Sequence, residues 1–314
     1  MFTRRELLLS SLVVSACATA HEPDSPDARF RNLAVLSESV HSGIASEDGE
    51  LRCTVRLCRY PTLGLAWVWV HARTRDGFFS YVDHLAPCGS AATDTGASNV
   101  RYSDAAGTLV FERRGLVGNP TGCSVRGSVL AHRSATSAFG RGDHRLDVDI
   151  QFSPARLYQG LNAGRTEVFG RSKATVRIDG KVTVIEGPGQ FHEQGQTTPR
   201  FTAPFCYMTL WGTDAASTML IAPKRRDGYL LEGDKATEIS DVVVDPPGAT
   251  RRAVHVTLKD GRALDGEARV VQAYTIPLVG NAWRGHMVTA QMPGMTFMGH
   301  VNDYIIGNGV PYAG

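Results

Sequence analysis

The 314-residue sequence lacks an excess of one charge, because 33 Lys and Arg stand against 31 Asp and Glu. The basic triplet Lys224–Arg226 precedes Asp227-Gly228 and is typical of a solvated hairpin turn. Attraction to a polyanion has no support here, so we expect no nucleic-acid partner. The N-terminal apolar stretch Leu7–Val14 is also too short to span a bilayer, which takes about 20 residues.

Signatures of common catalytic and cofactor-binding sites are missing as well. The sequence contains no G-x-S-x-G, no P-loop, no G-x-G-x-x-G and no H-E-x-x-H, so we expect no cofactor. It has no C-x-x-C pair, which argues against a redox motif and predicts no metal site. Only Cys88 with Cys123 is considered as a disulfide. Apart from Cys17 the cysteines are Cys53, Cys58, Cys88, Cys123 and Cys206, an odd number.

The sequence also lacks the apolar periodicity of an α-helix, since no stretch of about eleven residues after the N-terminal segment shows it. Short alternating runs with β-branched or aromatic residues are frequent instead, as in Leu51–Leu57 and Ala66–Val70. Ala174–Ile178 and Val182–Ile185 flank Asp179-Gly180 and predict a hairpin with a two-residue turn. The sequence therefore predicts an all-β protein, in which strands closed into a barrel can enclose one small ligand.

The N-terminal segment has the features of an export signal and is left out of the fold. Arg4-Arg5 resembles part of a twin-arginine signal, and Val14–Cys17 resembles a lipoprotein cleavage box. We therefore expect an exported, periplasmic lipoprotein that is anchored to a membrane through Cys17. The alternative is plain cleavage by signal peptidase within Ala18–Ala20.

The segment Gly187–Gly195, G-P-G-Q-F-H-E-Q-G, places a histidine next to a carboxylic acid between glycines. In an apolar cavity, burial would favour the protonated form of Glu193, and His192 could orient it or act as a base. The alternative is that both side chains point to solvent. Strand neighbours face opposite ways, but the flanking glycines permit a bulge that would bring the two together.

This segment and the run Pro199–Gly212, P-R-F-T-A-P-F-C-Y-M-T-L-W-G, resemble the middle of the carotenoid 1,2-hydratase (hydroxyneurosporene synthase)-like group. The chain departs from that group's G-x-G-Y-x-D-H-N-W-G pattern, since Gln190 stands near the tyrosine position and His192-Glu193 replaces Asp-His. The resemblance implies two consecutive lipocalin-like antiparallel β-barrel domains. It also implies hydratase chemistry.

The length of the chain suits two ordinary domains. We place their junction near residues 160–172, where Gly- and Asn-containing sequence breaks the alternating pattern. The expected organisation is a signal at 1–20, a linker at 21–29, an N-terminal lipocalin-like domain at 30–165 and a C-terminal one at 166–314.

Hydration or cyclisation of an alkene needs a proton donor, an apolar cavity and aromatic faces near the developing positive charge. Glu193 is the candidate donor, with His192 as its catalytic partner. For the two tryptophans at spacing two, ordinary barrel core is the alternative, because large aromatic residues dominate cores. Candidate substrate-binding residues come from both halves of the chain: Trp67, Trp69, Tyr81, Tyr207, His300, Asp303 and Tyr304.

The leading hypothesis is a cofactor-independent hydratase or cyclase that acts by acid catalysis on a hydrophobic isoprenoid or polyketide. Its partners would be that small molecule and, through the lipid anchor, a membrane. A lipocalin-like carrier lipoprotein without chemistry is the main alternative, because one fold hosts many functions. A β-sandwich that binds carbohydrate is a third hypothesis, supported only by scattered aromatic residues.

The lipid anchor can be tested by removing one thiol. We expect Cys17→Ser to move the exported protein from the membrane fraction to the soluble fraction, because serine cannot carry the thioether-linked lipid. Fractionation of cells followed by immunoblotting measures this, with the unaltered chain as control. A variant that remains with the membranes would contradict the assignment.

Overall fold

The computed structural model describes most of the chain after its first 34 residues. Cys17, the expected signal and the expected linker lie outside the described residues, so the lipid anchor stays a prediction. Within the described ranges, no helix is long and apolar enough to cross a membrane. These ranges are 35–88, 93–94, 99–116, 118–137, 139–159, 164–278 and 281–307.

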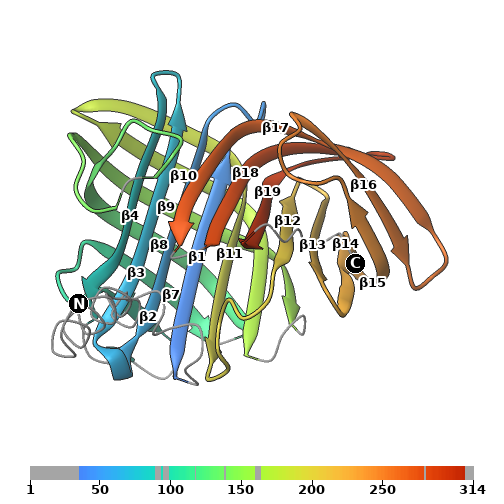
Figure 1. Ribbon diagram of the computed structural model, residues 1–314, viewed down its shortest axis with the longest axis horizontal. Helices are drawn as coiled ribbons and strands as arrows, with labels where there is room; N and C mark the ends of the chain where they lie inside the picture. The colour runs from blue at the N-terminus through green and yellow to red at the C-terminus, as the bar shows by residue number, and fades with distance from the viewer. Residues whose placement is uncertain are drawn as a thin grey trace, which may run out of the picture.

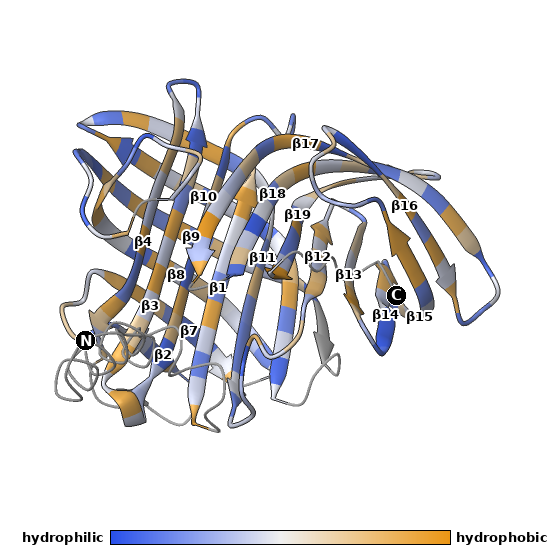
Figure 2. Ribbon diagram, in the orientation of Figure 1, coloured by the Kyte–Doolittle hydropathy of each residue, from blue (hydrophilic) through white to orange (hydrophobic). Residues whose placement is uncertain are grey.

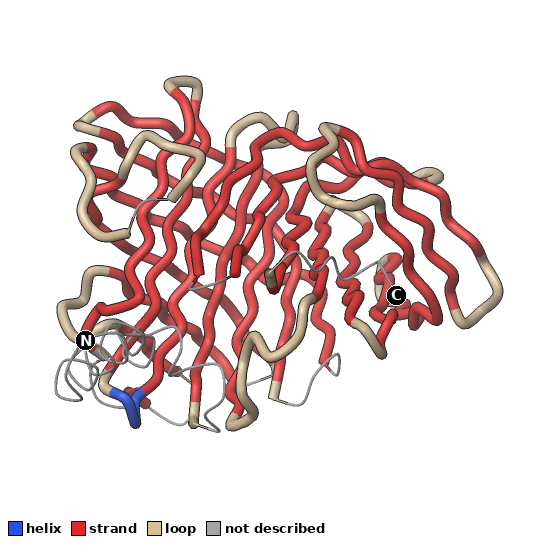
Figure 3. The backbone as a smooth tube through the Cα atoms, in the orientation of Figure 1, coloured by secondary structure: helices blue, strands red, loops and turns tan. Residues whose placement is uncertain are grey.

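Nearly all of the described chain is β-strand (Figures 1 and 3). The one helix within these ranges is the short 3-10 turn η1, Pro61–Leu63. The strands form two antiparallel units, an 11-stranded sheet followed along the chain by a closed barrel. The prediction of an all-β protein with two consecutive lipocalin-like units is therefore confirmed.

The first unit has the strand order β4-β3-β2-β1-β11-β10-β9-β8-β7-β6-β5. Most neighbours in the sheet are neighbours in sequence, as in a β-meander, and the pairing of β1 with β11 joins the two ends of the run. The strands are β1 (Ser37–Ala45), β2 (Arg52–Tyr60), β3 (Leu65–Thr74), β4 (Gly77–Pro87), β5 (Thr93–Asp94), β6 (Val100–Ser103), β7 (Leu109–Leu116), β8 (Asn119–Ala131), β9 (His144–Gln159), β10 (Arg165–Ile178) and β11 (Lys181–Gln196).

This sheet curls until its two ends approach each other. Backbone bridges join β4 and the residue after it to segments near the other end, Ser80 to His132 and Cys88 to Asp104. Because side chains alternate along a strand, every second residue faces the enclosed interior, and Figure 2 shows the resulting alternation of apolar and polar residues. The interior is an apolar core built on aliphatic side chains and on rings such as that of Phe111.

The second unit is a closed barrel of eight strands, in which β12 pairs with β19 to complete the circle. Closure leaves no unpaired edge, and alternate side chains fill the interior with a second apolar core. The strands are β12 (Phe205–Trp211), β13 (Ala215–Ala222), β14 (Arg225–Glu232), β15 (Lys235–Val244), β16 (Arg251–Leu258), β17 (Ala263–Leu278), β18 (Asn281–Met292) and β19 (Met295–Ile306).

The chain passes from one sheet to the other in residues 197–204, between β11 and β12. The β10–β11 hairpin belongs to the first sheet, because β10 pairs with β9 and β11 pairs with β1. Residue 165, the expected end of the first domain, is the first residue of β10 and lies within the first sheet. The break in alternation that suggested it is only the connection between two neighbouring strands of one sheet.

The second barrel packs against the outer face of the first sheet, where β19 lies beside β1 and β12 beside β11 (Figure 1). One apolar cluster across this interface joins Trp67 and Trp69 of β3 to Tyr274 and Met287 of the second barrel. A second cluster includes Phe169 of β10 with side chains of the second barrel. As a result β1, β2, β3 and residues 187–194 of β11 are largely buried on both faces.

All five described cysteines are free thiols. The considered disulfide between Cys88 and Cys123 is therefore not formed. Cys123 lies in the apolar core of the first unit, where burial raises the pKa of its thiol. Cys88 directly follows β4, and its backbone N–H donates a hydrogen bond to the carbonyl of Gly64.

Gly285 of β18 is packed beneath the ring of Tyr274, its neighbour on β17. A Cβ atom at this position would lie 2.1 Å from Cζ of that ring. We expect Gly285→Ala to lower the free energy of unfolding by about 1–3 kcal/mol, because the ring must be displaced from the interface. Urea unfolding measures the change.

Gly195→Ala is the matched control, since no atom lies within 4 Å of the added Cβ. Its free energy of unfolding should stay close to that of the unaltered chain. Equal effects of the two substitutions would show that the close contact between Gly285 and Tyr274 is unimportant.

Candidate functional site

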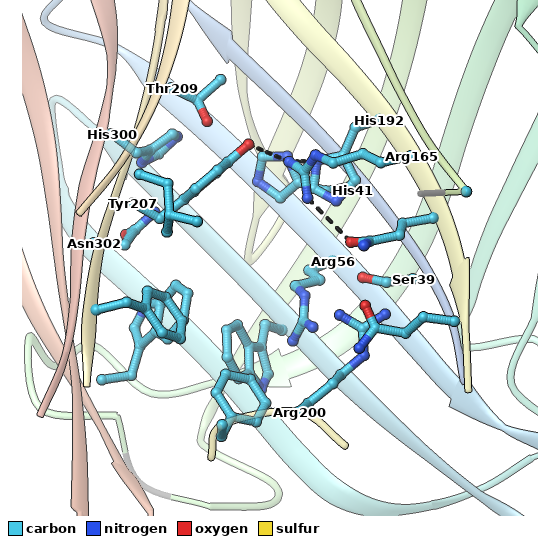
Figure 4. A pocket seen from close by; sticks show the side chains of 18 of the residues that line it. Ser39, His41, Arg56, Arg165, His192, Arg200, Tyr207, Thr209, His300 and Asn302 are labelled. Atoms are coloured by element: carbon cyan, nitrogen blue, oxygen red, sulfur yellow. Dashed lines mark hydrogen bonds between the residues drawn. The ribbon is translucent and has the colours of Figure 1, made fainter. Parts of the chain in front are cut away.

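A cavity of about 750 Å³ lies between the two units (Figure 4). One wall comes from β1, β2, β3, β10 and β11, and the other from β12, β13, β17, β18 and β19. The connection between β11 and β12 borders it as well. This volume is within the usual range of small-molecule sites. The described lining includes histidine and arginine side chains but neither aspartate nor glutamate.

Strand β11 explains how polar side chains reach the cavity. Its residues alternate between two buried faces, so that Phe191 packs in the first core while Gln190 and His192 line the cavity. The pairing of β11 with β1 and with β10 is continuous through this segment. The bulge that would turn both motif residues to one face is therefore not present.

Glu193 consequently lies on the face opposite to His192, inside the first unit. It is 5% exposed, it forms an ion pair with Arg113 at 2.9 Å, and the Tyr102 hydroxyl donates a hydrogen bond to it at 3.3 Å. Burial raises the pKa of its carboxyl, although the charge of Arg113 opposes the rise. The sheet thus separates the predicted catalytic pair, and only His192 reaches the cavity.

A buried carboxylate that the sequence did not single out, Glu167 of β10, lies just behind the cavity wall and is 1% exposed. Arg165 donates two hydrogen bonds to it, at 2.6 and 2.9 Å. The hydroxyls of Tyr207 from β12 and Tyr229 from β14 donate one each. This carboxylate therefore binds three groups from two separate sheets.

The protonation states in this cluster follow from its hydrogen bonds. Burial alone would raise the pKa of Glu167, but the charge of Arg165 and the hydrogen bonds from Tyr207 and Tyr229 lower it overall. Burial raises the pKa of both tyrosines, so their hydroxyls stay protonated. Glu167 is thus an anion that holds Arg165 in place, and Arg165 also stacks over the Tyr207 ring at 4.8 Å.

A chain of hydrogen bonds orients His192. Arg165 approaches Nδ1 of His192 at 3.3 Å, and because arginine can only donate, this nitrogen accepts and the proton sits on Nε2. The Gln190 amide nitrogen donates to the same Nδ1 at 3.3 Å, while its oxygen accepts from Nδ1 of His41 at 3.1 Å. The Thr54 hydroxyl then donates to Nε2 of His41 at 2.7 Å. His192 is thereby fixed as a hydrogen-bond donor through Nε2–H.

Four histidines around the cavity are electrically neutral near pH 7. Burial lowers the pKa of His41 and of His71 to about 3, and it holds the pKa of His192 and of His300 well below the ordinary value of 6.5. The positive charge of Arg165 lowers the pKa of His192 further. His41 stacks on His192 at 5.2 Å and meets the edge of His300 at 6.0 Å. The three imidazoles therefore form one group at the polar part of the cavity (Figure 4).

Aromatic rings form the remaining wall. Trp69 of β3 meets Trp283 of β18 edge to face at 5.4 Å, and Phe201 of the connection lies 6.1 Å from Trp283. Trp69 lines the cavity, whereas Trp67 does not. Trp67 stacks behind the wall on Phe201 at 5.6 Å, as the core alternative for this pair requires. Phe205 and Tyr274 complete this surface.

The other predicted binding residues divide into two groups. Tyr207 and His300 line the cavity. Tyr81 packs in the first core, and Asp303 lies within the second barrel, where Arg252 donates hydrogen bonds to it at 2.8 and 3.2 Å. The Tyr304 hydroxyl donates to a backbone carbonyl of the connection at 3.1 Å and supports the wall from behind. Alternation turns Tyr81 and Asp303 to other faces, whereas Tyr304 lies on the same face of β19 as His300 but packs in the apolar interface cluster beside the cavity.

Within the described part of the chain, no three His, Cys, Asp or Glu side chains converge in a way that could hold a metal ion. The sequence did not single out several residues of the site, among them the polar residues His41, Gln190, Arg165 and Glu167 and, on the aromatic wall, Trp283. A weak signal existed, since His41 and Thr54 lie in strands along which polar and apolar residues alternate. Such a pattern normally indicates a solvent-facing side, and only the packing of the second barrel turns it into a cavity wall.

No protein-family model matches the chain, and no curated protein sequence matches it either. Solved structures do share the fold. CghA, solved with Sch210972, has a TM-score of 0.54 at 11% identity over 88% of this chain and 90% of its own. An AttH-type protein of Nitrosomonas europaea has a TM-score of 0.56 at 13% identity over 91% of this chain and 94% of its own.

Kievitone hydratase of Nectria haematococca has a TM-score of 0.47 at 8% identity, and the match covers 86% of this chain and 88% of that one. At these identities the likeness to CghA and to the Nitrosomonas protein establishes the fold. Neither CghA nor the Nitrosomonas protein is described as a carotenoid 1,2-hydratase, so the comparison supports the two-barrel lipocalin-like fold and not membership of that group.

The neutral histidines make stability depend on pH. Unfolded His71 titrates near 6.5 and folded His71 near 3, so the unfolded state binds the extra proton between these values and stability falls as pH drops below 6.5. Between pH 7.5 and pH 5 the unaltered chain should lose about 2 kcal/mol more than His71→Gln. Urea unfolding at both pH values measures the difference. Equal losses of unfolding free energy in the two proteins would contradict a buried, neutral His71.

Proposed function

We propose that this protein is a cofactor-independent hydratase or cyclase that acts on a carbonyl-activated alkene in a mostly apolar small molecule. The observation that carries the proposal is the composition of the cavity, in which an aromatic wall faces a group of oriented, neutral imidazoles. An apolar body would bind against Trp69 and Trp283. The oxygen-bearing part would then lie near His192 and Arg165.

His192 supplies the first part of the chemistry. Its Nε2–H is held ready to donate a hydrogen bond to a carbonyl oxygen, and the fixed Nδ1 contacts prevent the ring from presenting the other nitrogen. As electron density moves from the alkene toward that oxygen, a donor already in place stabilises the developing negative charge. The nearby charge of Arg165 acts in the same direction.

His300 supplies the second part. It lines the cavity, and no hydrogen bond from its ring nitrogens to another described residue is found, so a neutral imidazole nitrogen is free to accept a proton. In hydration, a water molecule would give this proton to His300 while its oxygen bonds to the carbon β to the carbonyl. The α carbon then takes this proton from His300, which completes the product and returns His300 to its neutral state.

Cyclisation uses the same groups with fewer steps. The hydrogen bond from His192 would lower the electron density of the alkene, and the aromatic wall would hold the chain in a folded conformation. Bringing two reacting carbons together in this way removes much of the entropic barrier. The new ring bonds form from the electrons of the double bonds, so no net proton transfer is needed.

This mechanism replaces the carboxylic acid expected from the sequence. Protonation of an isolated alkene needs a strong acid, and the described lining of the cavity contains neither aspartate nor glutamate. Glu193 lies on the other face of β11, and Glu167 is ionised by its partners. An alkene already activated by a carbonyl needs only hydrogen-bond donors and a weak base, which the cavity does contain.

The test begins with the natural ligand. Extraction of the purified protein with organic solvent and mass spectrometry would identify a co-purifying molecule, which is then incubated with the protein. Hydration adds the mass of one water, and cyclisation keeps the mass but changes retention and ultraviolet absorption. Binding without either change would leave the carrier alternative as the better description.

We expect His192→Gln to lower the rate about 10²–10³-fold while ligand binding changes little, because glutamine keeps the polar contact but does not reproduce the oriented N–H. His255→Gln, which alters an exposed histidine of the second barrel, is the matched control and should keep full activity. An unchanged rate in His192→Gln would remove this residue from the mechanism.

A further inference from the structure

Two arginines of the cavity have no role in the proposed chemistry. Arg56 comes from β2 and Arg200 from the connection between β11 and β12, and both line the cavity (Figure 4). Nη1 of Arg56 and Nη2 of Arg200 are buried and have no hydrogen-bond partner among the described residues. The hydrogen bond found for the Arg200 guanidinium goes from Nε to the Ser37 hydroxyl at 2.9 Å.

Two carboxylates of the first sheet are committed to other arginines. Glu167 binds Arg165 at 2.6 Å, and Glu38 binds Arg59 at 2.7 Å. Among the described residues, no acidic side chain forms an ion pair with Arg56. That guanidinium instead lies over the ring of Trp69, 4.5 Å from the centroid. The cavity therefore carries more positive than negative charge.

An unpaired charge away from bulk water is costly, so proteins normally keep it only where a partner neutralises it. The guanidinium group presents donors in a planar fork that matches the two oxygens of a carboxylate. The four histidines cannot supply the missing negative charge, and Arg165 is already neutralised by Glu167. A negatively charged group on the ligand would supply the partner that Arg56 and Arg200 lack among the described residues.

We propose that Arg56 and Arg200 form a carboxylate-binding site and that the ligand is an apolar molecule bearing one carboxylate. This inference rests on the proposed function for the apolar body of the ligand and adds its anionic group. The position of Arg56 on the Trp69 ring sets the carboxylate at the border between the polar part and the aromatic wall. A ligand bound in this way has one orientation, which holds its reactive alkene on the same side in every binding event.

The experiment compares three probes with one polyene body, retinoic acid, methyl retinoate and retinol. Quenching of tryptophan fluorescence reports binding, because Trp69 and Trp283 line the cavity. In the unaltered chain we expect the acid to bind at least about tenfold more tightly than the ester or the alcohol, as a charge-assisted hydrogen bond predicts. In Arg56→Gln and in Arg200→Gln this ratio should fall to within about threefold.

Arg126→Gln is the matched control, because it removes one positive charge from an exposed site on β8. It should keep the ratio of acid affinity to ester affinity found in the unaltered chain. This result would show that the preference comes from the arginines of the cavity and not from the net charge of the protein. Circular dichroism confirms that each variant is folded. If neither cavity variant folds, the ratio measured on the unaltered chain decides the question alone.

Equal affinities for acid and ester in the unaltered chain would overturn the carboxylate site, and so would a preference that survives both cavity substitutions. Failure of all three probes to bind would count against the apolar ligand, and hence against the proposed function as well. A clear preference for the acid without turnover of any ligand would support the carboxylate site and contradict only the proposed enzymatic activity.

Discussion

The buried Glu167 carboxylate is the interaction on which the site depends most. It belongs to the first sheet, yet two of its partners, Tyr207 and Tyr229, belong to the second barrel. Removal of the carboxylate would leave the buried guanidinium of Arg165 without its ion-pair partner and would take one hydrogen-bond acceptor from each tyrosine. Breaking such a buried ion pair typically costs about 3–5 kcal/mol, so this residue links the position of one barrel to that of the other.

The same carboxylate determines the chemistry one step away. It fixes Arg165, and Arg165 decides which nitrogen of His192 carries the proton. A charged residue thus acts without touching the ligand, through a neighbour that can only donate hydrogen bonds. Neutral imidazoles beside a guanidinium would otherwise be free to rotate or to exchange tautomers, and a site with undefined donors would stabilise no particular charge distribution.

Alternation along the strands was enough to predict the all-β fold, because apolar side chains at every second position need a common interior. The same rule also gave the correct outcome for His192 and Glu193, which face opposite sides, and the glycines nearby did not form the bulge that the catalytic pair required. Glu167 could not be recognised from sequence, since a polar residue on an outer face normally contacts water. Its burial follows from where the second barrel packs, which depends on contacts between residues far apart in the chain.

Strands with two buried faces also restrict how this protein can change. In β11 a one-residue insertion or deletion would send Phe191 toward the histidines and His192 into the apolar core, so that both interiors fail at once. A strand with one wet face tolerates polar or apolar residues on that side. In the buried part of β11, residues 187–194, each position belongs to one interior or the other, and sequence variation there should therefore proceed by substitution, with changes of length only in the turns.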